Sequence, residues 1–185
     1  MLHSFSAPSS STTLMDTRTI YLLSYRAAPR QRAHFAIFVP SAAVPTMGAR
    51  IHVVGAPVTG FRLEFVRNYC PDETQRAVKI FAIGQVYSFN IVDSVGTAQT
   101  TDSIPRGNIE VAASHIPAPG ISENFMAPVN DTTNRRCQEW TMEFIRYLVA
   151  QGLIAAEAIQ IVQSQRDPPN HGIGLQPFHH WQGFE

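Results

Sequence analysis

The chain has 185 residues, which is enough for one domain with a sizeable hydrophobic core. Fourteen basic residues balance fourteen acidic ones, so the formal net charge is zero. A general polyanion-binding protein needs a basic field, and we therefore expect no nucleic-acid partner.

Residues 1–17 are rich in serine and threonine and lack a long apolar core, so they predict a disordered segment rather than a signal peptide. No stretch approaches the roughly 20 apolar residues of a membrane-spanning helix. We expect a soluble, cytoplasmic protein without a transmembrane segment. Residues 18–165 are predicted to form a single α+β domain, and residues 166–185 an irregular tail.

The first half of the domain predicts strands. Its segments are short, rich in β-branched and aromatic residues, and separated by Pro, Gly and Ser. They span residues 19–26, 34–40, 49–55, 61–69 and 77–86. Their regular spacing predicts an antiparallel meander of about five strands.

The second half predicts helices packed against that sheet. A first helix is expected over about residues 103–114, followed by a long loop over 115–134. Two further helices are expected over 134–151 and about 153–165. Long loops in compact domains are often functional.

Cys137 lies in the first turn of the 134–151 helix, where Thr133 or Asn134 can act as the cap. Helix dipole and free first-turn N–H groups favour a thiolate there, and two preceding arginines add positive potential. Cys137 also begins an apolar face that continues through Trp140 and Phe144. It is therefore either a nucleophile or a small packed residue, and the nucleophile needs a histidine partner.

Two histidines occupy neighbouring predicted strands. His34 begins "HFAIFV" and His52 lies within "IHVV". If the two strands form a hairpin in which paired residue numbers sum to 88, His34 and His52 are diagonal neighbours on one face. A lone strand histidine is more often a satisfied core or surface group, but the pair makes a candidate site.

Other candidates are weaker. Cys70 precedes a proline in a turn, and a Cys70–Cys137 disulfide is the structural alternative for both thiols. His115 lies in the long loop. His179 and His180 lack acidic or cysteine partners, so we expect no metal site and no cofactor.

The segments "HFAIFV", "IHVV" and "NRRCQEW" together resemble the circularly permuted papain-like fold of lecithin-retinol-acyltransferase-like proteins and PPPDE peptidases. The frame over about residues 19–155 more closely resembles a group of uncharacterised fungal proteins of this suspected fold. One departure is that Arg136 stands where that family has an asparagine before its cysteine.

The resemblance implies a cysteine-dependent hydrolase or acyltransferase acting on an acyl, ester, amide or peptide bond. Cys137 would attack the carbonyl, His34 would exchange the proton, and His52 would orient His34. Trp140 and Gln138 would contact a small-molecule or acyl substrate, with core packing as the alternative for Trp140. Two other functions stay open: a cyclase or isomerase using the same pocket for acid–base chemistry, and a non-catalytic binding or accessory protein. The oligomeric state also stays open.

Overall fold

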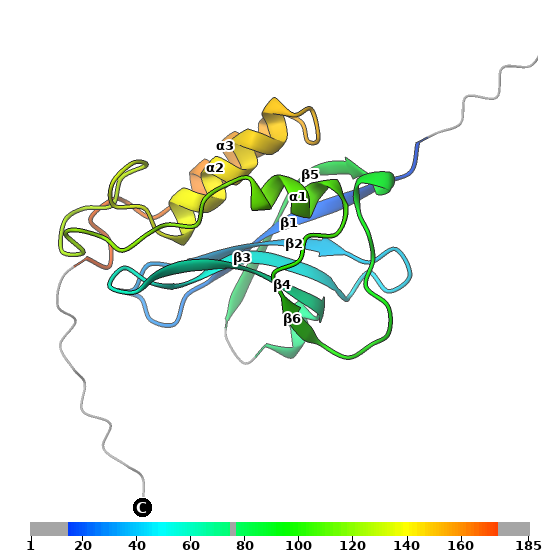
Figure 1. Ribbon diagram of the computed structural model, residues 1–185, viewed down its shortest axis with the longest axis horizontal. Helices are drawn as coiled ribbons and strands as arrows, with labels where there is room; N and C mark the ends of the chain where they lie inside the picture. The colour runs from blue at the N-terminus through cyan, green and yellow to red at the C-terminus, as the bar shows by residue number, and fades with distance from the viewer. Residues whose placement is uncertain (1–14, 75–76, 174–185) are drawn as a thin grey trace, which may run out of the picture.

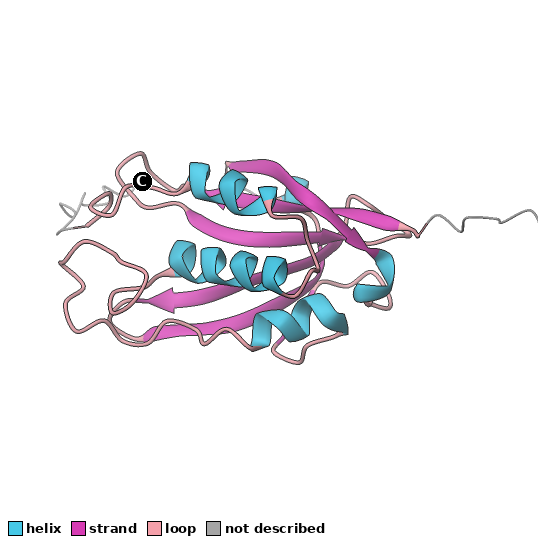
Figure 2. Ribbon diagram, turned by 90° about the horizontal axis from the view of Figure 1, so that it is seen from above, coloured by secondary structure: helices cyan, strands magenta, loops and turns pink. Residues whose placement is uncertain are grey.

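The computed structural model describes residues 15–74 and 77–173 and consists of an antiparallel sheet with three α-helices on one of its faces (Figure 1). Seen from above, the helices lie over the strands as a separate layer (Figure 2). The α+β class and the antiparallel sheet predicted from the sequence are confirmed. The strands are β1 (Thr17–Tyr25), β2 (His34–Pro40), β3 (Gly48–Ala56), β4 (Gly60–Tyr69), β5 (Val78–Tyr87) and β6 (Thr100–Asp102).

The strand order is β5-β1-β2-β3-β4-β6. Strands β1 to β4 form the predicted meander, but β5 pairs with β1 and not with β4. The predicted five-strand meander is wrong at this point, because the short strand β6 occupies the other edge of β4. Strand β6 has only three residues and no alternating pattern, so the sequence does not reveal it.

Residues 70–74, which follow β4, lie on the face of the sheet that the helices leave open (Figure 1). They include the 3₁₀ turn η1 (Pro71–Glu73), whose Pro71 is buried and lies beside Tyr21 and Phe38. Further along, Thr74 lies beside Tyr25 and His34. This crossing segment, residues 70–74, therefore covers part of the open face.

The helices are α1 (Gly107–Ser114), α2 (Cys137–Ala150) and α3 (Glu157–Gln165), and a second 3₁₀ turn, η2 (Ser88–Asn90), follows β5. Helix α2 packs on the sheet through Trp140, Phe144 and Leu148, each fully buried, as the sequence predicts. Helix α1 begins later than predicted because residues before Pro105 are disfavoured in a helix and residues 100–102 pair as β6.

The two faces of the sheet carry two separate apolar clusters, because successive strand residues point to opposite sides. On the helix side, Phe35 and Ile37 of β2 pack with Trp140 of α2. On the open side, Ala36 and Phe38 of the same strand pack with residues of other strands, which are Leu23, Tyr25, Val66 and Tyr69.

Arg67 holds the far edge of the sheet together. Its buried guanidinium donates to Asp102 of β6 at 2.8 Å and forms a short ion pair with Glu110 of α1. It also donates to the carbonyl of Ile104. One buried charge thus connects β4, β6 and α1.

Residues 166–173 contain no helix or strand but are bound to the body of the domain. Asp167 accepts hydrogen bonds from the backbone of Ala33 and from the side chain of Gln138, both at 2.8 Å. The rest of the predicted tail, with His179 and His180, lies outside the described residues. So does most of the predicted disordered segment, while its last residue, Thr17, already belongs to β1.

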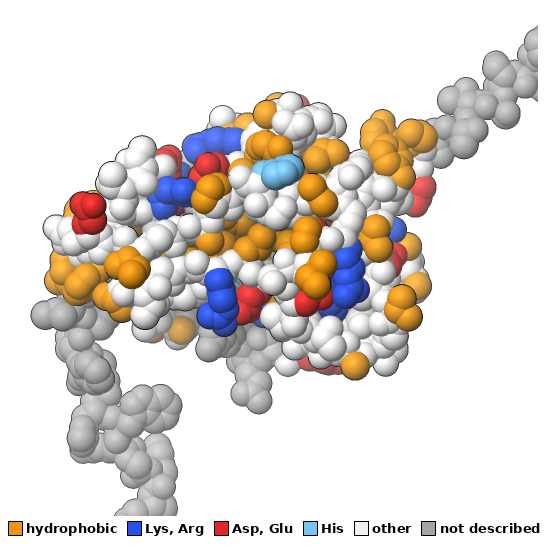
Figure 3. Space-filling model, in the orientation of Figure 1, with side chains coloured by type: hydrophobic (Ala, Val, Ile, Leu, Met, Phe, Trp, Pro, Cys, Tyr) orange, Lys and Arg blue, Asp and Glu red, His pale blue; other side chains and the backbone are white. Residues whose placement is uncertain are grey.

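Two surface properties bear on partners. Basic and acidic side chains are interspersed over the face shown in Figure 3. Among the described residues, no helix has the length and apolar character needed to cross a bilayer.

Candidate functional site

Cys137 is the first residue of α2 and lies on the helix side of the sheet. Its thiol donates a long hydrogen bond, 3.8 Å, to the carbonyl oxygen of Ala33. Burial raises the pKa of the Cys137 thiol to about 11, and the negative charge of Glu139 acts in the same direction. This is the opposite of the lowered pKa that the helix start suggests.

The positive charges near Cys137 have other partners. Arg135 pairs with Glu143 at 2.5 Å, and the Arg136 guanidinium donates to the carbonyl of Phe125 at 2.9 Å. Glu139 is 1% exposed and lies in the first turn of the same helix. Local positive potential is thus offset by a buried carboxylate.

The cap of α2 also differs from the predicted one. The backbone N–H of Arg136 donates to the side chain of Glu139 at 3.1 Å, so Arg136 is the cap residue. Asn134 is buried and instead binds the preceding loop, donating to the carbonyl of Ala127 at 2.8 Å. It accepts a hydrogen bond from Ser122 at 2.7 Å.

His34 faces the open side of the sheet. It is paired with Tyr25 on β1 and alternates with Phe35, which packs on the helix side. The predicted hairpin register is confirmed, since Ile37 pairs with Ile51 and the two numbers sum to 88. His34 Nε2 lies 2.8 Å from His52 Nδ1, so the two histidines meet as predicted.

The structure does not bring Cys137 together with these histidines. Cys137 packs with Phe35 on the helix side, whereas His34 and His52 lie on the opposite side with the sheet between them. The predicted Cys137–His34 pair is therefore not formed. The separation arises because His34 and Phe35 are adjacent residues of β2, and adjacent strand residues point to opposite faces of the sheet.

Gln138 and Trp140 were predicted to contact a substrate, and both side chains are fully buried. The Trp140 indole donates to the carbonyl of Ile116 at 3.1 Å, and its ring centre lies 5.4 Å from that of Phe144. Gln138 donates to the carbonyl of Ala33 at 2.8 Å and accepts from the backbone of Asp167 at 2.9 Å. Both residues hold the fold together in this arrangement, and their contact with a substrate stays a prediction.

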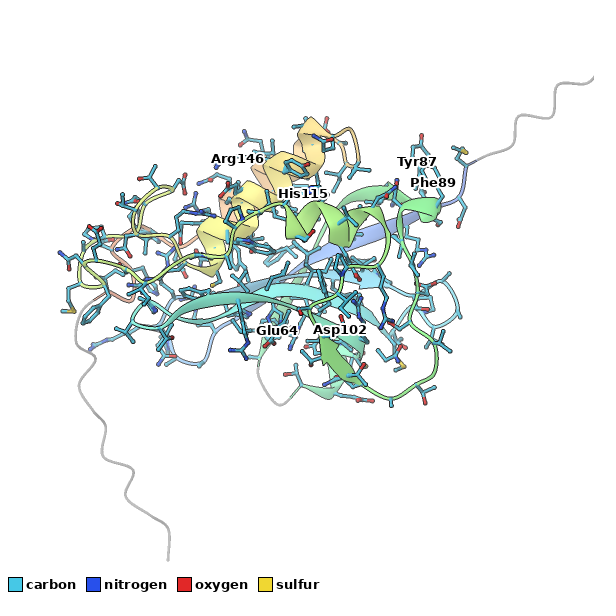
Figure 4. The ribbon with its side chains drawn as sticks, in the orientation of Figure 1. Glu64, Tyr87, Phe89, Asp102, His115 and Arg146 are labelled. Atoms are coloured by element: carbon cyan, nitrogen blue, oxygen red, sulfur yellow. The ribbon has the colours of Figure 1, made fainter. Side chains whose placement is uncertain are left out.

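A pocket of about 350 Å³ opens on the histidine side, lined by Tyr25, His34, Arg50, His52 and Thr74. Its volume falls within the range of small-molecule sites, roughly 300–1,000 Å³. Glu64, which pairs with His52 across β3 and β4, lies on this side of the sheet, whereas His115 and Arg146 lie with the helices (Figure 4).

His52 is 3% exposed. Burial lowers the pKa of His52 to about 2, and the positive charges of Arg50 and His34 lower it further. Its Nε2 has no hydrogen-bond partner among the described residues and lies 3.9 Å from a carboxylate oxygen of Glu64. An Nε2–H directed toward Glu64 leaves Nδ1 of His52 as the acceptor for His34.

Arg50 and Tyr25 complete the pocket wall, and Tyr69 contacts both of them. The Arg50 guanidinium carbon lies 4.3 Å from the centre of the Tyr69 ring and 6.0 Å from that of Tyr25. The two phenol oxygens are 2.7 Å apart. Burial and the hydrogen bond to Tyr69 raise the pKa of Tyr25 well above its usual value, so Tyr25 stays protonated.

Tyr25 and Arg50 were not predicted as site residues from the sequence. One signal was present: Arg50 and His52 are polar residues at alternate positions of a strand that is otherwise apolar, which places both on one face.

Neither the remaining cysteine nor the loop histidine belongs to the pocket. Cys70 and Cys137 are both free thiols. His115 bonds to the Tyr147 hydroxyl at 3.1 Å, on the helix side. Within residues 15–74 and 77–173, no cluster of three His, Cys, Asp or Glu side chains could hold a metal ion.

Residues 20–155 match a family of unknown function, DUF6540. The chain belongs to this family. The DUF6540 match contains Cys137 and every residue that lines the pocket, and it ends before α3. Comparisons with curated proteins and with solved structures give no match.

Proposed function

We propose that the open-face pocket performs non-covalent acid–base chemistry on a small molecule, as in an isomerase or a cyclase. The observation that carries this proposal is the 2.8 Å contact between His34 Nε2 and His52 Nδ1 within the pocket. His34 is the proton carrier, and His52 is a positioning residue that acts through it.

The different roles of His34 and His52 follow from the burial of His52. Because the pKa of His52 is lowered to about 2, a proton taken up by the pair resides on His34. The protonated His34 ring then donates its Nε2–H to Nδ1 of His52, which fixes the ring orientation. His34 accepts a proton from one substrate atom and returns it to another, so no net proton is consumed.

The Tyr25–Tyr69 pair supplies a neutral donor near His34. Either phenol can donate in the bond between them, and when Tyr69 is the donor the O–H of Tyr25 stays available in the pocket. A hydrogen bond from it would stabilise negative charge that develops on a substrate oxygen when His34 removes a proton.

The permuted papain-like fold, and the cysteine hydrolase or acyltransferase it implies, stay predictions. The antiparallel β2–β3 pair and the packing of α2 across the sheet support that fold. The raised pKa of the Cys137 thiol does not support the covalent route. If that route operates, p-nitrophenyl acetate should add an acetyl mass at Cys137 that is lost in His34→Ala.

The acid–base proposal can be tested with 5-nitrobenzisoxazole, a probe that reports an accessible base. The base removes the carbon-bound proton, the N–O bond breaks, and a coloured cyanophenolate forms. We expect turnover above that of free imidazole, with loss in His34→Ala and a smaller loss in His52→Gln. Cys137→Ala should retain the rate.

His115→Ala is the matched control, because His115 lies on the helix side and, among the described residues, its side chain hydrogen-bonds only to Tyr147. Turnover that is equal in His34→Ala and in the wild type would contradict the proposal. Loss of turnover in Cys137→Ala, with His34→Ala unaffected, would instead favour chemistry at the thiol.

A further inference from the structure

We infer that the ligand of the open-face pocket carries an oxyanion, a carboxylate or a phosphate, and that the Arg50 guanidinium binds it. This inference deepens the proposed function and rests on the same pocket. It identifies Arg50 as the residue that selects the class of substrate.

The first observation is that Arg50 lacks a carboxylate partner. Within the described part of the chain, no carboxylate lies within salt-bridge reach of Arg50, and its Nε is buried without a hydrogen-bond partner. Most other arginines form ion pairs, as Arg18 does with Asp93 at 2.6 Å and Arg32 with Glu139 at 2.8 Å. An uncompensated positive charge at a pocket wall raises the free energy of the folded protein unless a ligand neutralises it.

The second observation is the way the guanidinium is held. Its centre lies 4.3 Å from the Tyr69 ring centre, a distance typical of a cation–π contact. Stacking engages the face of a planar guanidinium. A hydrogen bond from Arg50 to the Tyr25 hydroxyl uses part of its edge and opposes the rise in the pKa of Tyr25, and the other N–H groups are left for a ligand. Those N–H groups match the two oxygens of a carboxylate or phosphate in a bidentate geometry.

The third observation is the chemistry around Arg50. His34 and Tyr25 line the same pocket, and the Tyr25–Tyr69 pair has one O–H beyond the hydrogen shared between the phenols. The nearby carboxylate, Glu64, is already paired with Arg62 at 2.7 Å. The pocket thus offers a fixed cation and a neutral donor, which suit an anion, next to the proton carrier.

Binding can be followed on the full chain by NMR, using the Arg50 Nε–H signal and the ring signals of His34 and His52. The probes are acetate, phosphate and the neutral acetamide, each titrated at constant ionic strength with sodium chloride. We expect saturable shifts with acetate or phosphate and none with acetamide. The anion that binds with the higher affinity is the oxyanion that the site prefers.

Arg50→Met should weaken binding of that anion tenfold or more, since a charge-assisted bidentate contact is lost. Arg50→Lys keeps the charge but not the planar fork, and should give a smaller loss. Arg146→Met is the matched control, because it removes the same charge from the helix side, where Arg146 is exposed (Figure 4). It should leave the affinity unchanged.

Three results would overturn the inference: acetamide shifts equal to those of acetate, no saturable shift with either anion, or anion binding unchanged in both Arg50 variants. None of these three results would contradict the acid–base proposal, provided that 5-nitrobenzisoxazole turnover still requires His34. Conversely, loss of the His34 requirement with anion binding intact would refute the catalytic proposal and leave an anion-binding protein.

Discussion

Alkylation of the two cysteines by iodoacetamide should proceed in the order Cys70 before Cys137. Both thiols are free and both are partly buried, so they form an internal comparison. Burial raises the pKa of Cys137 from 9.0 to about 11. At pH 8 this shift lowers the thiolate fraction roughly 100-fold, and the thiolate is the form that reacts.

The two rates can be measured by quenching aliquots over time and quantifying the two cysteine-containing peptides by mass spectrometry. Repetition from pH 7 to pH 10 gives the dependence of each rate on thiolate formation. In concentrated guanidinium chloride the chain is unfolded, and both cysteines should then react at similar rates. That control separates the effect of the fold from the local sequence.

Preferential labelling of Cys137 in the folded protein would refute this reasoning. The refutation would be stronger if His34→Ala removed the preference, because His34 could then act on the thiol despite lying on the other face of the sheet. Such a result would restore the cysteine hydrolase or acyltransferase as the better account.

The remaining predictions concern stability. Arg67→Met should lower the free energy of unfolding by roughly 3–5 kcal/mol in urea denaturation, because Glu110 is left as an unpaired buried charge. The double variant with Glu110→Gln should recover part of that loss. Trp140→Ala, which empties a fully buried site, should cost roughly 3–5 kcal/mol in the same assay, and a loss under 1 kcal/mol would contradict the packing described. The pKa of His52 is lowered to about 2 in the folded state, so between about pH 6.5 and pH 2 the unfolded chain binds more protons and stability falls as the pH is lowered. His52→Gln should flatten that slope, by at most about 1.4 kcal/mol per pH unit, in thermal melts.

The strands could be predicted well because their residues have a strong local preference. The segment "HFAIFVP" is enriched in β-branched and aromatic residues, and the structure forms β2 over the same residues, His34–Pro40. Contact between His34 and His52 followed from one condition, an even register sum, because residues of matching parity then lie on one face of the hairpin.

The face on which the histidines lie could not be predicted. In β2 the residues on one side, Phe35 and Ile37, are as apolar as Ala36 and Phe38 on the other. The reason is that both faces are covered, one by helices and the other by the crossing segment with its buried Pro71. Alternation alone therefore does not show which side α2 occupies.

The pKa of Cys137 depends on partners that are distant in sequence. Glu139 is visible two residues further along, but its burial depends on Arg32 and Arg166, which donate to it at 2.8 Å and 2.9 Å. The local sequence shows the positive charges of Arg135 and Arg136, but it does not show that the Glu139 carboxylate beside Cys137 is buried.

The position of β1 has a consequence for how the chain folds during synthesis. Strand β1 is first in sequence but lies inside the sheet, between β2 and β5. Hairpins of β1 to β4 can form from local contacts, whereas the β1–β5 pairing joins residues as distant as Thr17 and Tyr87. Until residue 87 has left the ribosome, one long edge of β1 therefore exposes unpaired backbone groups, and the nascent chain is most prone to edge-to-edge aggregation in that interval.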